Sequence, residues 1–332
     1  MIGDYLWRHL TFFMRNYTKF SFLLPETSIL FCNFGPQMRS ELSALIPTYN
    51  GDCRRQVAEL CRQASTIEGL RYEIIVADDG STDTSQVALC REIAKWPYCR
   101  FIERKTNEGR ASIRNFLAQQ AQYEWLLFMD CDMTVKPGLL LNYLSCDEEA
   151  EVVDGGVSIG QGEADNLRYL YEKACEASHT AEQRQQQPFQ HFHTANFMVK
   201  REVMGRFPFD ERYRNYGYED VFFGKQLAKN RVRILHINNP AGFDTFEANE
   251  QFVAKTEEGL RTLHTFRQEL RGYSRMLTFV SGIHLGCIRW LIRCWHQLFG
   301  PMERRNLCSR HPKLSIFTLY KIGYYLTLTK ND

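Results

Sequence analysis

The sequence predicts an α/β protein in which a mostly parallel sheet is flanked by helices. Short apolar runs alternate with segments of helical periodicity, an order typical of parallel strands joined by helices. Polar motifs follow directly after three of the four predicted strands. The 332 residues are 44% hydrophobic and 24% charged, an ordinary globular composition that excludes a disordered chain, a collagen-like repeat and a coiled coil.

The four apolar runs have the length of buried strands and are bounded by turn residues. They cover residues 42–46, 73–77, 100–103 and 125–129. Three segments with helical spacing of apolar residues lie between them, at 52–66, 83–95 and 110–122. In an open parallel sheet, ligands bind outside the carboxyl ends of the strands. We therefore expect the polar motifs that follow these strands to lie along one edge.

Charge and composition divide the chain into an aromatic arm at 1–40, a main domain at 41–270 and a tail at 271–332. The formal charge is only +2, but the tail carries ten Lys and Arg against two acids, a local balance of +8. Its apolar runs at 276–288 and 314–328 are flanked by basic residues. We expect amphipathic helices on an anionic membrane surface. The alternative is that these helices pack on the main domain or on a second subunit.

The expected location is the cytoplasm, with peripheral contact to the inner face of the membrane. Eleven cysteines, an odd number without a CxxC pair, indicate unpaired thiols in a reducing compartment. No stretch of eighteen apolar residues predicts a spanning helix, and no cleavage site follows the apolar N-terminus. We expect no nucleic-acid partner.

Asp130 and Asp132 follow the apolar strand at 125–129. Where the chain turns at a strand end, two carboxylates two residues apart can both reach one cation. Such hard oxygen ligands suit Mg²⁺ or Mn²⁺ bridging substrate phosphates. A solvated turn is the alternative.

Asp78 and Asp79 precede Gly80 at the end of the strand at 73–77. Asp-Gly and the following Ser81 are common turn and helix-cap residues, so a purely structural turn is one interpretation. A turn does not require two adjacent carboxylates. We therefore expect one of them to accept hydrogen bonds from a base or a ribose.

These motifs together resemble the nucleotide-binding half of a family-two glycosyltransferase of GT-A fold. The matching segments are 46–50, 76–83, 107–115 and 129–133, and three further segments at 194–201, 209–213 and 216–224 resemble its acceptor side. The resemblance covers roughly residues 40–265.

The resemblance implies a role for each matching residue. The donor would contact Pro47, Tyr49, Asp78 or Asp79, Asn107, Arg114 and Asp130. Asp130 and Asp132 would hold the metal and diphosphate. Asp220 would be the base that deprotonates the acceptor, with Glu219 beside it positioning the acceptor, although both acids also suit the first turn of a helix. A single base with direct displacement implies inversion at the anomeric carbon.

The sequence departs from the family pattern at the third metal ligand. Many relatives have a histidine 20 to 30 residues after the Glu-Asp pair. Here either Asp244 substitutes for it, or the metal is held by Asp130 and Asp132 together with diphosphate and water alone. His236 lies too early, within a predicted strand. His191 and His193 are interpreted as structural residues rather than metal ligands, because no third ligand has suitable spacing.

The expected function is inverting, metal-assisted transfer of a sugar from a nucleotide sugar, with a UDP-sugar as the expected donor. The acceptor would be a hydroxyl of a saccharide or a lipid-linked saccharide. A sugar nucleotidyltransferase is one alternative, but it usually needs a Gly-rich, lysine-containing loop where this chain has Pro47 to Asn50. A non-catalytic, membrane-bound scaffold that binds nucleotide sugars is the other.

Overall fold

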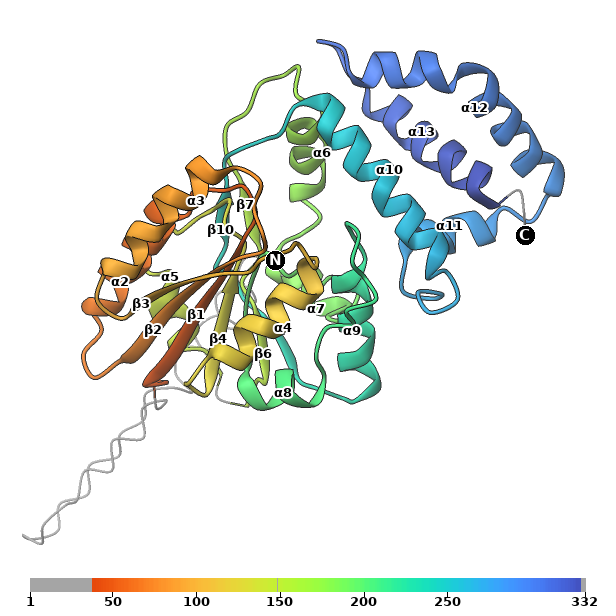
Figure 1. The fold of residues 1–332 in the computed structure, drawn as a ribbon. Helices are drawn as coiled ribbons and strands as arrows, with labels where there is room; N and C mark the ends of the chain where they lie inside the picture. Colours follow the sequence, from red (N-terminus) through yellow and green to blue (C-terminus); the bar gives the residue numbers. More distant parts are fainter. Residues whose placement is uncertain (1–37, 148, 330–332) are drawn as a thin grey trace, which may run out of the picture. The chain divides into compact units, whose positions relative to one another are not determined.

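A seven-stranded sheet lies at the centre of the fold, with strand order β3-β2-β1-β4-β8-β6-β9 (Figure 1). Only β8 runs antiparallel to its neighbours β4 and β6. The computed structural model describes residues 38–147 and 149–329, which fall within one unit of the chain. The strands are β1 (Glu41–Thr48), β2 (Arg71–Asp78), β3 (Cys99–Glu103), β4 (Trp125–Met129), β6 (Val152–Asp154), β8 (Asn196–Lys200) and β9 (Ile234–His236).

The structure confirms the predicted fold class. All four predicted strands are present, and the expected helices are α2 (Arg54–Ser65), α3 (Thr84–Cys90) and α4 (Arg110–Gln120). The segment expected as one helix over 83–95 is α3 followed by a 3₁₀ helix, η1 (Arg91–Lys95). The arm predicted at 1–40 lies outside the described residues as far as residue 37.

Strand residues alternate between two hydrophobic cores, one on each face of the sheet. On β1, Ala44 and Ile46 pack with α2 and α5 (Leu139–Leu144). Leu45 points to the opposite face and joins the core formed with α4, α8 (Arg201–Arg206) and α9 (Glu219–Lys229). Because both faces are covered by helices, the central strands read as continuous apolar runs.

Strand register brings the polar motifs to one edge. β1 and β2 pair in parallel with Thr48 opposite Asp78, and β4 lies on the other side of β1 and ends immediately before Asp130. A second, three-stranded sheet consists of β5 (Met133–Thr134), β10 (Ala241–Phe243) and β7 (Val157–Ile159). In it Phe243 pairs with Met133, which brings the chain after β10 beside Asp132.

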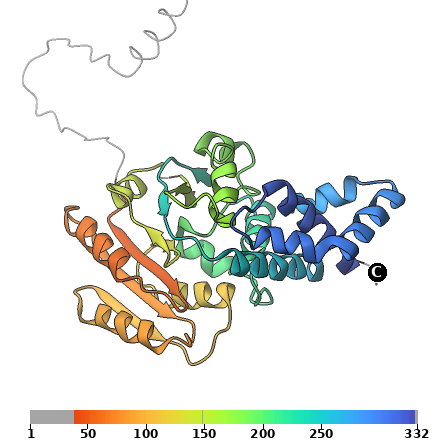
Figure 2. The same ribbon diagram turned by 90° about the horizontal axis from the view of Figure 1, so that it is seen from above.

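The C-terminal part of the described chain is helical (Figure 2). It comprises α10 (Asn249–Thr265), α11 (Arg275–Gly282), α12 (Gly286–Leu307) and α13 (Leu314–Leu328), and α6 (Leu167–Glu176) also contacts α10 and α13. In α13, Phe317, Tyr320 and Tyr325 are buried in cores shared with α6 and α10. The apolar run at 314–328 therefore packs against other helices of the chain, which was the alternative to membrane contact. Among the described residues, no helix combines the length and apolar character needed to cross a membrane.

Candidate active site

A cavity of about 360 Å³ opens at the carboxyl ends of β1, β2 and β4. It contains seven of the eleven site residues predicted from the sequence, whereas Asp78, Glu219, Asp220 and Asp244 lie outside its lining. Its walls are formed by Pro47, Thr48, Tyr49, Asp79, Asn107, Gly109, Arg110, Ile113, Arg114, Asp130, Asp132, Arg214, Tyr216, Lys255 and Glu258.

The two acids at the end of β2 have different environments. Asp78 accepts hydrogen bonds from the backbone and the hydroxyl of Ser81, so its carboxylate holds the turn. Asp79 is buried at the cavity wall and accepts hydrogen bonds from Arg104 (3.0 Å) and from the backbone N–H of Gly109 (2.9 Å). Burial raises the pKa of Asp79, although these donors oppose the shift. Of the two acids, only Asp79 faces the cavity.

Gly109 closes the cavity wall in a way that only glycine allows. Its φ is +93°, and a Cβ there would lie 2.5 Å from the backbone oxygen of Arg214. This close approach joins the N-terminus of α4 to the segment that leads into α9.

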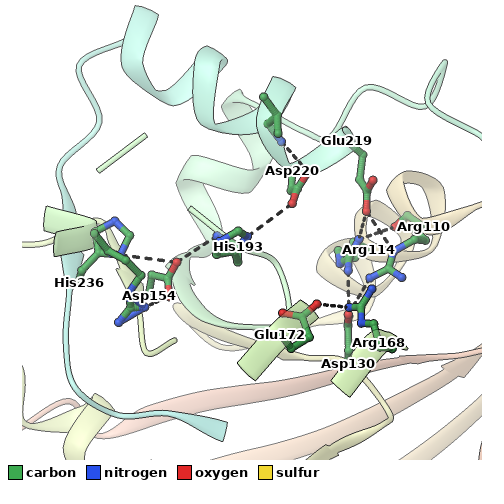
Figure 3. Close-up of polar contacts among 12 residues, drawn as sticks. Arg110, Arg114, Asp130, Asp154, Arg168, Glu172, His193, Glu219, Asp220 and His236 are labelled. Atoms are coloured by element: carbon green, nitrogen blue, oxygen red, sulfur yellow. Dashed lines mark hydrogen bonds and ion pairs between the residues drawn. The ribbon is translucent and has the colours of Figure 1, made fainter. Parts of the chain in front are cut away.

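Two arginines of α4 form a charge cluster with Asp130, which lines the cavity, and with Glu219 (Figure 3). Arg110 and Arg114 donate to separate oxygens of Asp130, at 2.6 and 2.8 Å. Both also donate to Glu219, at 3.0 and 3.3 Å. Burial alone would raise the pKa of Asp130, but the two guanidinium groups outweigh burial and lower it. Both oxygens of Asp130 are therefore engaged by cations of the protein.

Asp132 is the exposed acid of the motif and forms no ion pair with any residue in 38–147 or 149–329. Partial desolvation by the cavity wall raises the pKa of Asp132, and the negative charge of Asp130 raises it further. The positive charges of Arg110 and Lys255 oppose this rise. A carboxylate without an ion-pair partner suits a hard cation. Asp244 follows β10 directly, and the register of β10 on β5 places its backbone opposite Asp132, while its carboxylate lies against Gly160 and Gly242. Within the described part of the chain, no cluster of three or more His, Cys, Asp or Glu residues could hold a metal ion by itself.

Glu219 and Asp220 begin α9 and point in different directions, since successive helical residues are about 100° apart. Glu219 is buried and faces the arginines, whereas Asp220 faces His193 with 3.9 Å between Oδ2 and Nδ1 (Figure 3). Burial would raise the pKa of Asp220, but His193 outweighs it and lowers that pKa. Burial likewise would lower the pKa of His193, but Asp220 raises it.

Several cavity residues were missed by the sequence analysis. Arg110 could have been found, because it lies four residues before Arg114 and shares its helix face. Tyr216 begins one of the segments that resemble the family but was given no role of its own. Lys255 carries no local signal, since it reaches the cavity from α10, more than a hundred residues after the Asp130 motif. The Tyr216 ring contacts two cations of the cavity, with its centroid 5.6 Å from the Arg110 guanidinium and 5.9 Å from the Lys255 ammonium.

The model of the family described as "Glycosyl transferase family 2" matches residues 43–207, the segment that carries strands β1 to β4 and both acids of the Asp130 motif. The chain therefore belongs to glycosyl transferase family 2, a family of enzymes.

Similar proteins include chondroitin synthase of Escherichia coli, which is 31% identical over 124 residues, or 36% of this chain and 16% of that protein. An uncharacterized glycosyltransferase of Haemophilus influenzae is 31% identical over 91 residues, or 27% of this chain and 36% of that protein. The chain thus spans well under half the length of either relative. A mannosyltransferase of Pyrobaculum calidifontis, PcManGT, solved with GDP-Man and Mn²⁺, has a similar fold. That match has a TM-score of 0.51 at 16% identity and covers 88% of this chain and 86% of the other.

Proposed function

We propose that the protein transfers a sugar, with inversion, from a nucleotide-sugar donor to a hydroxyl of a saccharide or lipid-linked saccharide. One observation carries this proposal. A single polar cavity at the carboxyl ends of the parallel strands brings together Asp79, the arginine cluster of α4 and the unpaired carboxylate of Asp132.

Different parts of the cavity suit the nucleobase and the diphosphate of the donor. Pro47, the exposed ring of Tyr49 and Asp79 lie at the ends of β1 and β2 and would bind the nucleoside. Arg110 and Lys255 are the cations suited to diphosphate oxygens. The similar fold that binds GDP-Man supports a nucleotide sugar in general. A UDP-sugar is the donor that we propose to test first.

The residues present fit a divalent cation that also binds the donor. Asp132 would be its main protein ligand, with Asp244 as a second one. Asp130 would act indirectly, because it orients Arg110 and Arg114 beside the diphosphate. Mg²⁺ and Mn²⁺ are bound by few carboxylates when substrate phosphates and water complete the shell. When bound, the cation would neutralise charge on the departing diphosphate.

Asp220 is proposed as the base that takes the proton of the acceptor hydroxyl. Its side chain is 26% exposed, so an acceptor can reach it, and it is held at the first turn of α9. Glu219, at 5% exposure, would act indirectly by fixing Arg110 and Arg114. Attack from the side of Asp220, opposite the diphosphate, would give inversion.

The first test is thermal stabilisation by a panel of UDP- and GDP-sugars, each with and without Mn²⁺. We expect one donor class to raise the melting temperature in a manganese-dependent way, and Asp132→Asn to remove the manganese dependence. Asp147→Asn, which changes an exposed acid outside the lining of the cavity, is the matched control.

The second test measures release of nucleoside diphosphate from that donor, with saccharides and with water as acceptor. Donor binding without any release would favour the scaffold alternative. Formation of a nucleotide sugar from a nucleoside triphosphate and a sugar phosphate would favour a nucleotidyltransferase.

We further propose that α12 contacts an anionic membrane surface. Its exposed apolar side chains recur at helical spacing and include Ile288, Leu291, Trp295, Leu298 and Met302. Such a stripe fits a helix that lies in the interface plane. Basic residues on and beside the helix favour anionic lipid over a second copy of this stripe. These residues are Arg289, Arg293, Arg304, Arg305 and Arg310.

The membrane proposal is tested by co-sedimentation with vesicles of phosphatidylglycerol and phosphatidylcholine. Leu298→Glu should release the protein from the anionic vesicles, whereas Leu141→Glu, which alters an exposed leucine of α5, should not. High salt should weaken binding of the unaltered protein. Loss of a dimer in Leu298→Glu, with no vesicle binding by either form, would assign the stripe to a second copy instead.

A further inference from the structure

His193 is held at a fixed place by a buried carboxylate. Its backbone N–H donates to Asp154 Oδ2 at 3.0 Å. The other oxygen of Asp154 accepts from the backbone of Gly156 at 2.8 Å and from Arg184 at 3.0 Å. Asp154 lies on β6 and is fully buried. The position of His193 is therefore set by the core of the domain.

The imidazole of His193 points toward the proposed base (Figure 3). Nδ1 lies 3.9 Å from Asp220 Oδ2, and the side chains of His193 and Asp220 are 48% and 26% exposed. This separation is about 1 Å longer than a hydrogen bond, a looseness that is common at catalytic pairs without substrate. Both groups are accessible to solvent and hence to an acceptor.

Other titratable and charged groups surround the His193–Asp220 pair. The His179 ring centroid lies 5.8 Å from that of His193, and His191 contacts Arg275 rather than Asp220. Further groups that interact with His193 or Asp220 are Asp154, Glu172, Tyr218, His236 and Arg110. Among these, Asp220 is the anion that the His193 ring reaches within ion-pair distance.

A carboxylate that takes a proton from a hydroxyl must lose that proton before the next turnover. Neutral imidazole is the side chain best suited to receive it near neutral pH, because its ordinary pKa is about 6.5. His193 stands beside Asp220 and opens to solvent, so it could both receive the proton and release it.

We propose that His193 positions Asp220 and accepts the proton that Asp220 takes from the acceptor, an inference that rests on the proposed function. In the transfer step, the acceptor oxygen bonds to the anomeric carbon as the carbon–oxygen bond to the diphosphate breaks, and the electron pair leaves with the diphosphate. The acceptor proton moves to Asp220 Oδ2 and then to His193 Nδ1. The imidazolium finally releases it to water, which restores the carboxylate and the neutral ring.

This arrangement sets the direction of the pH dependence. The working form has an ionised Asp220 and a neutral His193. Asp220 raises the pKa of His193 above 6.5, so turnover should fall as the pH drops through that raised value. Without the imidazole, the acid limit should be set by Asp220 itself, whose ordinary pKa of 3.8 is then raised by burial. Because a carboxyl group ordinarily titrates below an imidazole, the acid limb should still move to lower pH.

The first experiment measures the pH profile of donor hydrolysis, with water as acceptor, for the stabilising nucleotide sugar. In His193→Asn the amide can still bond Asp220 but cannot take a proton, so we expect slower turnover and an acid limb that lies at lower pH than in the wild type. His191→Asn alters the same loop beside Arg275 and should keep the wild-type limb. An unmoved acid limb in His193→Asn would overturn the proposal.

The second experiment does not depend on activity. With ¹³C-labelled histidine, the His193 signal is assigned as the one of nine histidines that is missing in His193→Asn. Its pKa should lie above 6.5 in the wild type and fall in Asp220→Asn. An unchanged His193 pKa in Asp220→Asn would overturn the pairing, even if transfer is confirmed. If the pKa falls but no donor is hydrolysed by any form, the proposed function fails while the coupling of the two groups is supported.

Discussion

Replacing Arg114 by methionine tests whether the buried charge cluster holds the cavity together. Arg114 is 1% exposed and bridges Asp130 and Glu219 at 2.8 and 3.3 Å. Its loss leaves two acids with Arg110 as their shared cation. Breaking a buried pair costs about 3–5 kcal/mol, and we expect the lower end because Arg110 remains. For a domain of this size, about 3 kcal/mol corresponds to a melting temperature lower by roughly 6 °C.

The assay is thermal unfolding at pH 7, followed by circular dichroism. The matched control is Arg212→Met, because Arg212 also bridges two carboxylates, Asp210 at 2.6 Å and Glu269 at 2.8 Å, but is 59% exposed. Exposed pairs contribute little, so its melting temperature should fall by no more than about 2 °C. Equal shifts in the two variants, or an Arg114→Met protein as stable as the wild type, would refute the reasoning that burial makes this cluster strong.

Three further predictions follow from the site. Asp220→Asn should lower turnover by about 10²–10⁴-fold with unchanged donor stabilisation, and NMR of the wild-type product should show inversion; retention would remove Asp220 from this role. Gly109→Ala should melt lower than Gly138→Ala, because both positions have positive φ but only the first meets the backbone of Arg214; equal melting temperatures would contradict the clash. Protonation of Asp130, whose pKa is lowered in the folded state, should reduce the free energy of unfolding as the pH falls below about 4; an acid denaturation curve that is flat from pH 5 to pH 2 would contradict this linkage.

The sequence alone predicted the architecture and the edge of the sheet where the site lies. Apolar runs bounded by turn residues identified β1 to β4, because a buried parallel strand must be apolar on both faces. Chain topology then placed the residues after Thr48, Asp78 and Met129 at one edge. Local pattern also marked the tail as helical, and its second apolar run coincides with α13.

Tertiary structure decided which of two neighbouring acids does what. Asp78 turns toward Ser81 and Asp79 toward the cavity, and Glu219 turns toward the arginines while Asp220 turns toward His193. In each pair, two neighbouring residues both carry a carboxylate, so the sequence does not distinguish them. Their roles differ because distant elements of the fold provide different partners on each side.

Contacts between distant parts of the chain also decided the rest of the site and the packing of the tail. Lys255 on α10 reaches a cavity formed by strands more than a hundred residues earlier in the chain, and no spacing rule links them. The apolar residues of α12 and α13 look alike in sequence, yet α13 is covered by α6 and α10 while α12 exposes Trp290 and Leu298. Hydrophobic periodicity determines that a helix has an apolar face, whereas only the packing of the whole chain determines what that face meets.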